Sequence, residues 1–165
     1  MLQKTNIEKL ILDLDSLYHN CHKSDLEVYY SKFACLELCG WIELAMDDIV
    51  IEYANNNLYE SHNILYIKEK VIGNTFGFHY DNHFRPMIMR LVGLNYLELI
   101  ESELNKTGEL DILKAELSTL WGIRKSAAHT TVTVGTAVSY NSPSIIKNHL
   151  DNVYPILDKI NKLIN

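Results

Sequence analysis

Apolar residues recur at intervals of three and four positions along most of this chain, which is the spacing of one face of an α-helix. In the last segment they follow steps of 4, 3, 4, 3 and 4 from Ile146 to Ile164. Short runs rich in Asn, Gly and Thr separate the periodic segments and predict loops. The pattern predicts helices over about 6–20, 25–55, 62–71, 86–105 and 109–128, and a last helix from Pro143 onward.

The residues at the expected helix ends agree with these limits. Thr5 and Ser24 each begin a Ser/Thr-x-x-Glu capping box, and Pro86 and Pro143 suit the first turn of a helix. Pro155 lies inside the last helix. A proline there removes one backbone hydrogen bond, so it is expected to kink the helix or to split it in two.

The segment 25–55 is apolar on more than one side, which is typical of a helix at the centre of a bundle. We therefore predict an all-α fold, an antiparallel bundle of about five helices in a single domain, residues 1–165. Between the last two helices, residues 130–141 include β-branched residues that alternate around Gly135. This stretch is predicted to form a loop or a short hairpin.

The composition agrees with a helical globular protein. The 165 residues include only 7 Gly and 3 Pro, below the usual ~7% and ~5%. No stretch of about 18 or more apolar residues occurs and no signal-peptide pattern opens the chain, so we expect a cytoplasmic protein without a membrane span. Cys21, Cys35 and Cys39 lack the spacing of a zinc site or a disulfide framework, and we expect reduced thiols.

One charged residue breaks the apolar pattern of the helix over 109–128. Continuing its leucine stripe four positions beyond Leu120 reaches Arg124, in the middle of the apolar face. A buried guanidinium costs several kcal/mol unless it is paired, and such breaks are enriched at functional sites. The alternative is that Arg124 extends to solvent at the end of the helix. The leucines of the stripe are Leu110, Leu113, Leu117 and Leu120.

The residues around Arg124 resemble a known signature. The run from Leu120 to His129 is similar to the R-x4-H signature of HEPN domains, small α-helical bundles many of which are metal-independent RNases. The pair lies at the end of the penultimate long helix, and Ala128 directly precedes the histidine, as is frequent in this family. The helix over 25–55 is also similar to the early helix of small stand-alone HEPN proteins, including the RiboL-PSP group. The resemblance implies an endoribonuclease that is a toxin or defence effector, forms a homodimer with a composite site, and has in some cases a cognate antitoxin.

These residue types suit cleavage of RNA by its own 2′-hydroxyl. The reaction needs a base, an acid and cations at the phosphorus centre; His129 titrates near neutrality and Arg124 presents a charged planar fork to phosphate oxygens. One histidine cannot be both the base and the acid of this reaction. A two-fold homodimer that brings two copies of His129 together would supply both groups. Lys125 and Ser126 are predicted to contact the RNA substrate, and we expect no metal and no cofactor.

Other interpretations stay open. On an ideal helix Arg124 and His129 are about 140° and about 7.5 Å apart, so they converge only if the helix ends near Ala128 or the cleft crosses its end. Lys125 stands directly after the arginine, where the family often has Asn or Asp. Thr131 stands two residues after the histidine, where toxins paired with nucleotidyltransferase antitoxins often have Tyr. The alternatives are a HEPN-like binding or dimerisation module without nuclease activity, such as an antitoxin or immunity component, and a bundle that binds a small molecule.

Two further groups of polar residues are weaker candidates. His79, Asp81 and His83 suggest a metal site, but their spacing matches no standard zinc signature and a helix cap at Asp81 explains them as well. Lys147 and His149 are expected on the polar face of the last helix, with Lys147 a candidate for a phosphate contact.

The net charge of −6 argues against nucleic acid as a partner only when the chain is taken as a whole. Residues 1–119 contain 10 Lys and Arg against 19 Asp and Glu, a net of −9. Residues 120–165 contain 5 against 2, a net of +3. The segment with the signature is therefore basic, which allows a small cleft for a short RNA segment.

Overall fold

The computed structural model describes residues 2–129 and 140–165, and these contain seven α-helices, two π-helical segments and no strand. The π-helical segments are Ile67–Ile72, directly after α3, and Tyr80–Phe84, directly before α4. The α-helices are α1 (Thr5–Asn20), α2 (Ser24–Asn57), α3 (Ser61–Tyr66), α4 (Arg85–Val92), α5 (Leu94–Asn105), α6 (Glu109–His129) and α7 (Pro143–Ile164).

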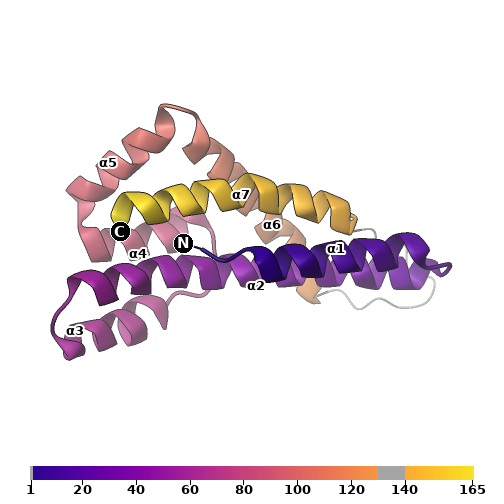
Figure 1. Cartoon of the computed structure of the whole chain (residues 1–165), viewed down its shortest axis with the longest axis horizontal. Coiled ribbons are helices and arrows are strands. Elements are labelled where there is room, and N and C mark those ends of the chain that lie inside the picture. The colour runs from indigo at the N-terminus through magenta and orange to yellow at the C-terminus, as the bar shows by residue number, and fades with distance from the viewer. Residues whose placement is uncertain (1, 130–139) are drawn as a thin grey trace.

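The molecule is a helical bundle, as predicted. Figure 1 shows α1, α2 and α7 as long helices that lie along one direction, with α1 antiparallel to the other two. The α6 helix passes behind α7 and α2 at a steep angle, and its C-terminal end emerges beyond α2 (Figure 1). The α6 helix contacts both α2 and α7. Arg124 and His129 belong to the C-terminal part of α6, the end that emerges beyond α2.

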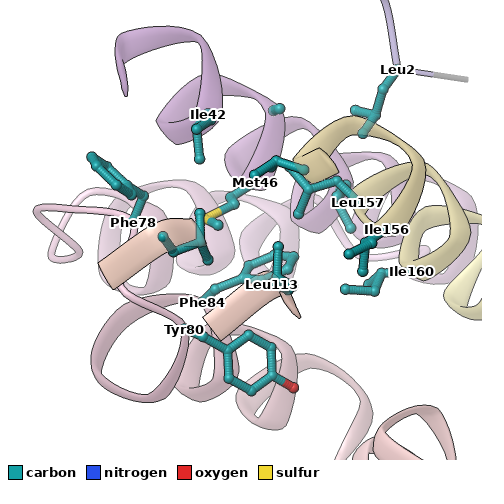
Figure 2. Packing of buried hydrophobic residues seen from close by; sticks show 14 of the residues in the cluster. Leu2, Ile42, Met46, Phe78, Tyr80, Phe84, Leu113, Ile156, Leu157 and Ile160 are labelled. Carbon is teal, nitrogen blue, oxygen red and sulfur yellow. The ribbon is translucent and has the colours of Figure 1, made fainter. Parts of the chain in front are cut away.

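The predicted apolar stripes form one hydrophobic core between these helices. Side chains from α2, α6 and α7 meet there with aromatic rings from the segment before α4 (Figure 2). Tyr80 is the largest of the fully buried side chains, and its hydroxyl donates a 3.0 Å hydrogen bond to Glu101, which also accepts one from Arg85 at 2.7 Å. The core therefore satisfies its buried phenol. Labelled core residues include Ile42, Met46, Phe78, Phe84, Leu113, Leu157 and Ile160.

The described residues form seven α-helices where about five were expected, because the short piece over 62–71 contributes α3 and the helix expected over 86–105 is two helices. The segment over 86–105 breaks at Gly93, whose φ of +79° is accessible to glycine and strained for other residues. Its positive φ turns the chain between α4 and α5. The short piece expected over 62–71 is also resolved into α3 and the π-helical segment that follows it.

The last helix contains the proline that was expected to kink or to split it. Pro155 lies inside α7, which continues from Pro143 to Ile164, so of the two expected outcomes the split does not occur. Of the loop or hairpin expected over 130–141, residues 130–139 lie outside the described part of the chain, and residues 140 and 141 are not helical.

Candidate active site

The leucine stripe of α6 is buried as predicted, and it leads directly to Arg124. Leu110, Leu113, Leu117 and Leu120 are all in the core. Arg124 continues the same stripe, yet its side chain keeps 32% of its surface exposed. Neither of the extremes considered from the sequence applies, because this guanidinium is neither fully buried nor free in solvent.

Glu43 of α2 holds Arg124 in place. The Nη1 atom of Arg124 donates to Glu43 Oε1 at 2.7 Å, and Nη2 donates to Oε2 at 3.1 Å. This is the bidentate geometry that fixes both position and orientation of a guanidinium. The guanidinium carbon also lies 5.6 Å from the ring centre of Phe78 and 5.7 Å from that of Trp121, within cation–π distance.

Arg124 and His129 both line one surface depression. Its volume is about 230 Å³, and its described lining comes only from α6: Trp121, Arg124, Lys125, Ala128 and His129. The described part of α6 extends to His129, and the depression lies along its residues 121–129. Ser126, the other predicted contact, is exposed but does not line this depression.

Arg124 also lines a second depression. It has a volume of about 460 Å³ and is lined by Arg124, by residues of α2 and by the loop before the π-helical turn. Asp47 contributes a second carboxyl group there, one helical turn beyond Glu43. Burial, together with the nearby charge of Glu43, raises the pKa of Asp47 to about 6. The sequence contains no motif that would have singled out Glu43 or Asp47.

Trp121 forms the wall between the first depression and the core. Its ring packs edge-to-face against Phe78 with centres 5.5 Å apart, and it lies 5.7 Å from the ring of His83. The backbone passes close beneath these rings at Gly77, where a Cβ would come within 2.8 Å of both Trp121 and His83. Glycine is therefore required at this point, because any side chain would displace the indole.

Two of the three residues considered for a metal site, His83 and Asp81, are engaged in other contacts, whereas the buried Nδ1 atom of His79 has no hydrogen-bond partner among the described residues. The Nδ1 atom of His83 accepts a 3.0 Å hydrogen bond from the backbone N–H of His79, and burial lowers the pKa of His83. Asp81 pairs with Lys114 at 3.1 Å. Within residues 2–129 and 140–165, no three His, Cys, Asp or Glu side chains are grouped so that they could hold a metal ion.

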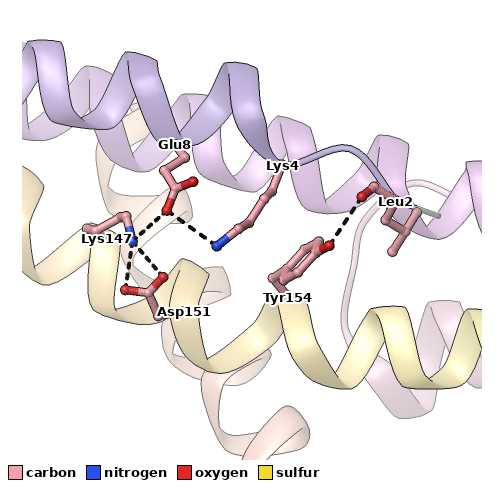
Figure 3. A network of polar contacts seen from close by, with 6 residues as sticks. All are labelled: Leu2, Lys4, Glu8, Lys147, Asp151 and Tyr154. Carbon is pink, nitrogen blue, oxygen red and sulfur yellow. Dashed lines mark hydrogen bonds and ion pairs between the residues drawn. The ribbon is translucent and has the colours of Figure 1, made fainter.

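Lys147, the other candidate for a phosphate contact, is held between carboxylates. Figure 3 shows its ammonium group between Glu8 of α1 and Asp151 of α7. The Lys147 Nζ atom lies 3.1 Å from Glu8 and 2.6 Å from Asp151, and only 18% of the side chain is exposed. This network joins α1 to α7 and leaves Lys147 little freedom to reach a ligand.

His149 is also paired within the bundle. Its Nδ1 atom lies 2.5 Å from Glu116 of α6, and Asn152 donates a 2.6 Å hydrogen bond to the other oxygen of the same carboxylate. These contacts join α7 to α6 away from Arg124, so His149 has a structural partner.

The search for related proteins returned nothing: no family model matches the chain, and no curated protein or solved structure matches it. In the part of the chain that the structure describes, no helix combines the length and apolar character needed to cross a membrane. The site must therefore be interpreted from its own geometry.

Proposed function

We propose that this chain is a metal-independent endoribonuclease of HEPN type that acts in the cytoplasm as a toxin or defence effector. The observation that carries the proposal is the depression at the end of α6, where a cation of fixed orientation and an exposed histidine line the same surface. The resemblance of Arg124 and His129 to the R-x4-H signature supports the same assignment.

In this mechanism Arg124 binds the scissile phosphate. Guanidinium has five N–H donors, and Glu43 takes one from each Nη atom, so three donors remain for non-bridging oxygens. Glu43 holds the group in orientation, which lowers the entropy lost when phosphate binds. Lys125 adds a second positive charge at the rim of the depression.

Proton transfer falls to His129 in two copies of the chain. One imidazole takes the proton of the 2′-hydroxyl while its oxygen forms a bond to phosphorus. The bond from phosphorus to the 5′-oxygen breaks, and the imidazolium of the second copy gives its proton to that oxygen. The products are a 2′,3′-cyclic phosphate and a 5′-hydroxyl, so no water and no metal is consumed.

The test is cleavage of RNA by purified protein with EDTA present throughout. We expect Arg124→Ala and His129→Ala each to lose about 100-fold or more of the rate, because general acid–base and electrostatic contributions have that size. Arg90→Ala and His22→Ala, at exposed positions outside the depression, are matched controls expected to keep full activity. Equal rates in all five proteins, or no cleavage and no growth arrest by the wild type, would overturn the proposal.

A second function has one observation in its favour. Both Nη atoms of Arg124 already donate to Glu43, so the pair also suits a purely structural role between α2 and α6. The chain would then be a HEPN-like binding or dimerisation module, for instance an antitoxin or immunity component. In that case Arg124→Ala would lower stability, and RNA would remain intact with every variant.

A further inference from the structure

An aromatic ring stands exposed on the loop before the π-helical segment Tyr80–Phe84. Phe76 keeps 80% of its surface exposed, whereas the backbone on both sides of it is fixed. On one side, the Thr75 hydroxyl donates a 2.7 Å hydrogen bond to the carbonyl oxygen of Val71. On the other side, Gly77 is buried and packed against the ring of Trp121. The Phe76 ring is therefore presented to solvent from a fixed support.

A carboxyl group without a hydrogen-bond donor lines the same depression as this ring. Asp47 of α2, Phe76 and Arg124 all border the depression of about 460 Å³. One helical turn before Asp47, the carboxylate of Glu43 is paired with Arg124. No group among residues 2–129 and 140–165 donates a hydrogen bond to Asp47. A half-buried acceptor without a donor is unfavourable, and a ligand with N–H groups would satisfy it.

We propose that this depression binds the base of a guanosine nucleotide whose phosphate lies on Arg124. Phe76 would stack on the base, and the Asp47 carboxylate would accept hydrogen bonds from its N1–H and its N2 amino group. Among the four RNA bases, guanine has two adjacent N–H donors on its Watson–Crick edge, whereas adenine and cytosine each offer one amino group and uracil one N–H. An ionised carboxylate can only accept hydrogen bonds, so guanine is the base that uses both of its oxygens.

The two depressions that share Arg124 would then hold different parts of one RNA strand. Lys125 and His129 line the first, where positive charge attracts the scissile phosphate. Asp47 lines the second, where its negative charge disfavours a phosphate and leaves the space to the neighbouring base. The substrate would therefore be RNA that is cleaved next to a guanosine. This last step rests on the proposed nuclease function, whereas the binding of a guanosine nucleotide does not.

The experiment measures the dissociation constants of four nucleotides by isothermal titration calorimetry at about pH 7.5. At this pH the Asp47 carboxyl is ionised, since its pKa is about 6. The probes are the 3′-monophosphates of guanosine, adenosine, cytidine and uridine, which contain no phosphodiester bond and are not consumed by the proposed reaction. We expect the wild type to bind the guanosine nucleotide about 10-fold more tightly than the other three, because a bidentate contact to a base discriminates by about that factor.

Two variants of the depression separate its two contacts. Asp47→Asn keeps the shape of the side chain, and we expect it to bind the guanosine nucleotide about 10-fold more weakly and to lose the preference for it. Phe76→Ala removes the stacking ring, and we expect all four nucleotides to bind about 10-fold more weakly. The matched controls are Asp48→Asn and Tyr59→Ala, at exposed positions that do not line this depression, and both should keep the affinities of the wild type.

The outcomes for the base site and for the nuclease are distinct. Equal affinity of the wild type for the four nucleotides, or no measurable binding of any, would overturn the base site. A guanosine preference that persists in Asp47→Asn, or unchanged affinities in Phe76→Ala, would overturn it too. A guanosine preference that Asp47→Asn abolishes, together with no RNA cleavage by the wild type, would refute the nuclease alone. RNA cleavage without preference for guanosine, in mononucleotide binding and in the positions cut, would refute the base site alone.

Discussion

The pair between Arg124 and Glu43 gives the sharpest energetic prediction, because it joins helices through residues 81 positions apart in the chain. Two unit charges about 4 Å apart attract by about 4 kcal/mol at an effective dielectric constant of 20. Desolvation offsets part of this. Exposed pairs yield about 0.2–1 kcal/mol, and removal of one partner from a fully buried pair costs about 3–5 kcal/mol. Side chains that are 32% and 27% exposed lie between these limits.

We therefore expect Arg124→Met and Glu43→Gln each to lower the free energy of unfolding by about 2 kcal/mol, or the melting temperature by about 4–8 °C. The double-mutant cycle should give a coupling energy of about 1–1.5 kcal/mol. Urea unfolding followed by circular dichroism at neutral pH measures it. Repeating the cycle in about 1 M NaCl should leave most of the coupling, because a half-buried bidentate pair is screened less than a surface pair.

The control is an exposed ion pair on the surface. Lys106 and Glu103 lie on the outside of the bundle, with 66% and 41% of their side chains exposed, and the same cycle there should give a coupling close to zero. A coupling for Arg124 and Glu43 below about 0.3 kcal/mol, within the usual error of additivity, would refute the claim that Glu43 orients the guanidinium.

Three further predictions follow from other residues of the structure. The pKa of Asp47 is raised to about 6, so the folded state holds its proton after the unfolded state has lost it, and stability falls as pH rises from about 4 to about 6. Asp47→Asn should therefore raise the melting temperature more at pH 7.5 than at pH 5. An equal shift at both pH values would contradict the assignment. Gly77 has a φ of +133° and a Cβ there would lie 2.8 Å from two side chains, so Gly77→Ala should lower the free energy of unfolding, measured in urea, by about 3 kcal/mol. Gly108 also has a positive φ but open space around it, so Gly108→Ala should lower it by only about 1–2 kcal/mol. In a thiol titration of the native protein Cys21 should react fast while buried Cys35 and Cys39 react only on unfolding, and three fast thiols would show that the α2 core is open.

The helices were predictable because their signal is local. Periodic apolar positions give the long helices within a few residues, and the stripe on α6 is buried as expected. The break at Gly93 was missed although its cause is local, because a glycine inside a periodic pattern indicates a boundary only when its φ is known to be positive. Pro155 was expected to kink or split the last helix, and the helix is not split, since a helix that packs along the bundle tolerates one missing hydrogen bond.

The site was predictable only in part. Arg124 stood out because it breaks an apolar stripe, and that signal lies within one helix. Glu43 did not stand out, because its role depends on how α6 crosses α2, which no spacing within α2 reveals. Asp47 and Gly77 lie near Arg124 for the same reason. A sequence pattern reveals the unusual residue, whereas the partner that neutralises its charge is brought to it by tertiary packing.

The position of α7 in chain order has a consequence during protein synthesis. This helix is made after the candidate site, yet it packs on α1, α2 and α6. A ribosome that has just added His129 still has to add residues 130–164, which takes about 2–7 s at about 5–20 residues per second. Until then α6 lacks a helix against which it packs, and the surface around Arg124 has no completed core behind it. The helix that carries Arg124 therefore gains its full packing only after α7 has been made.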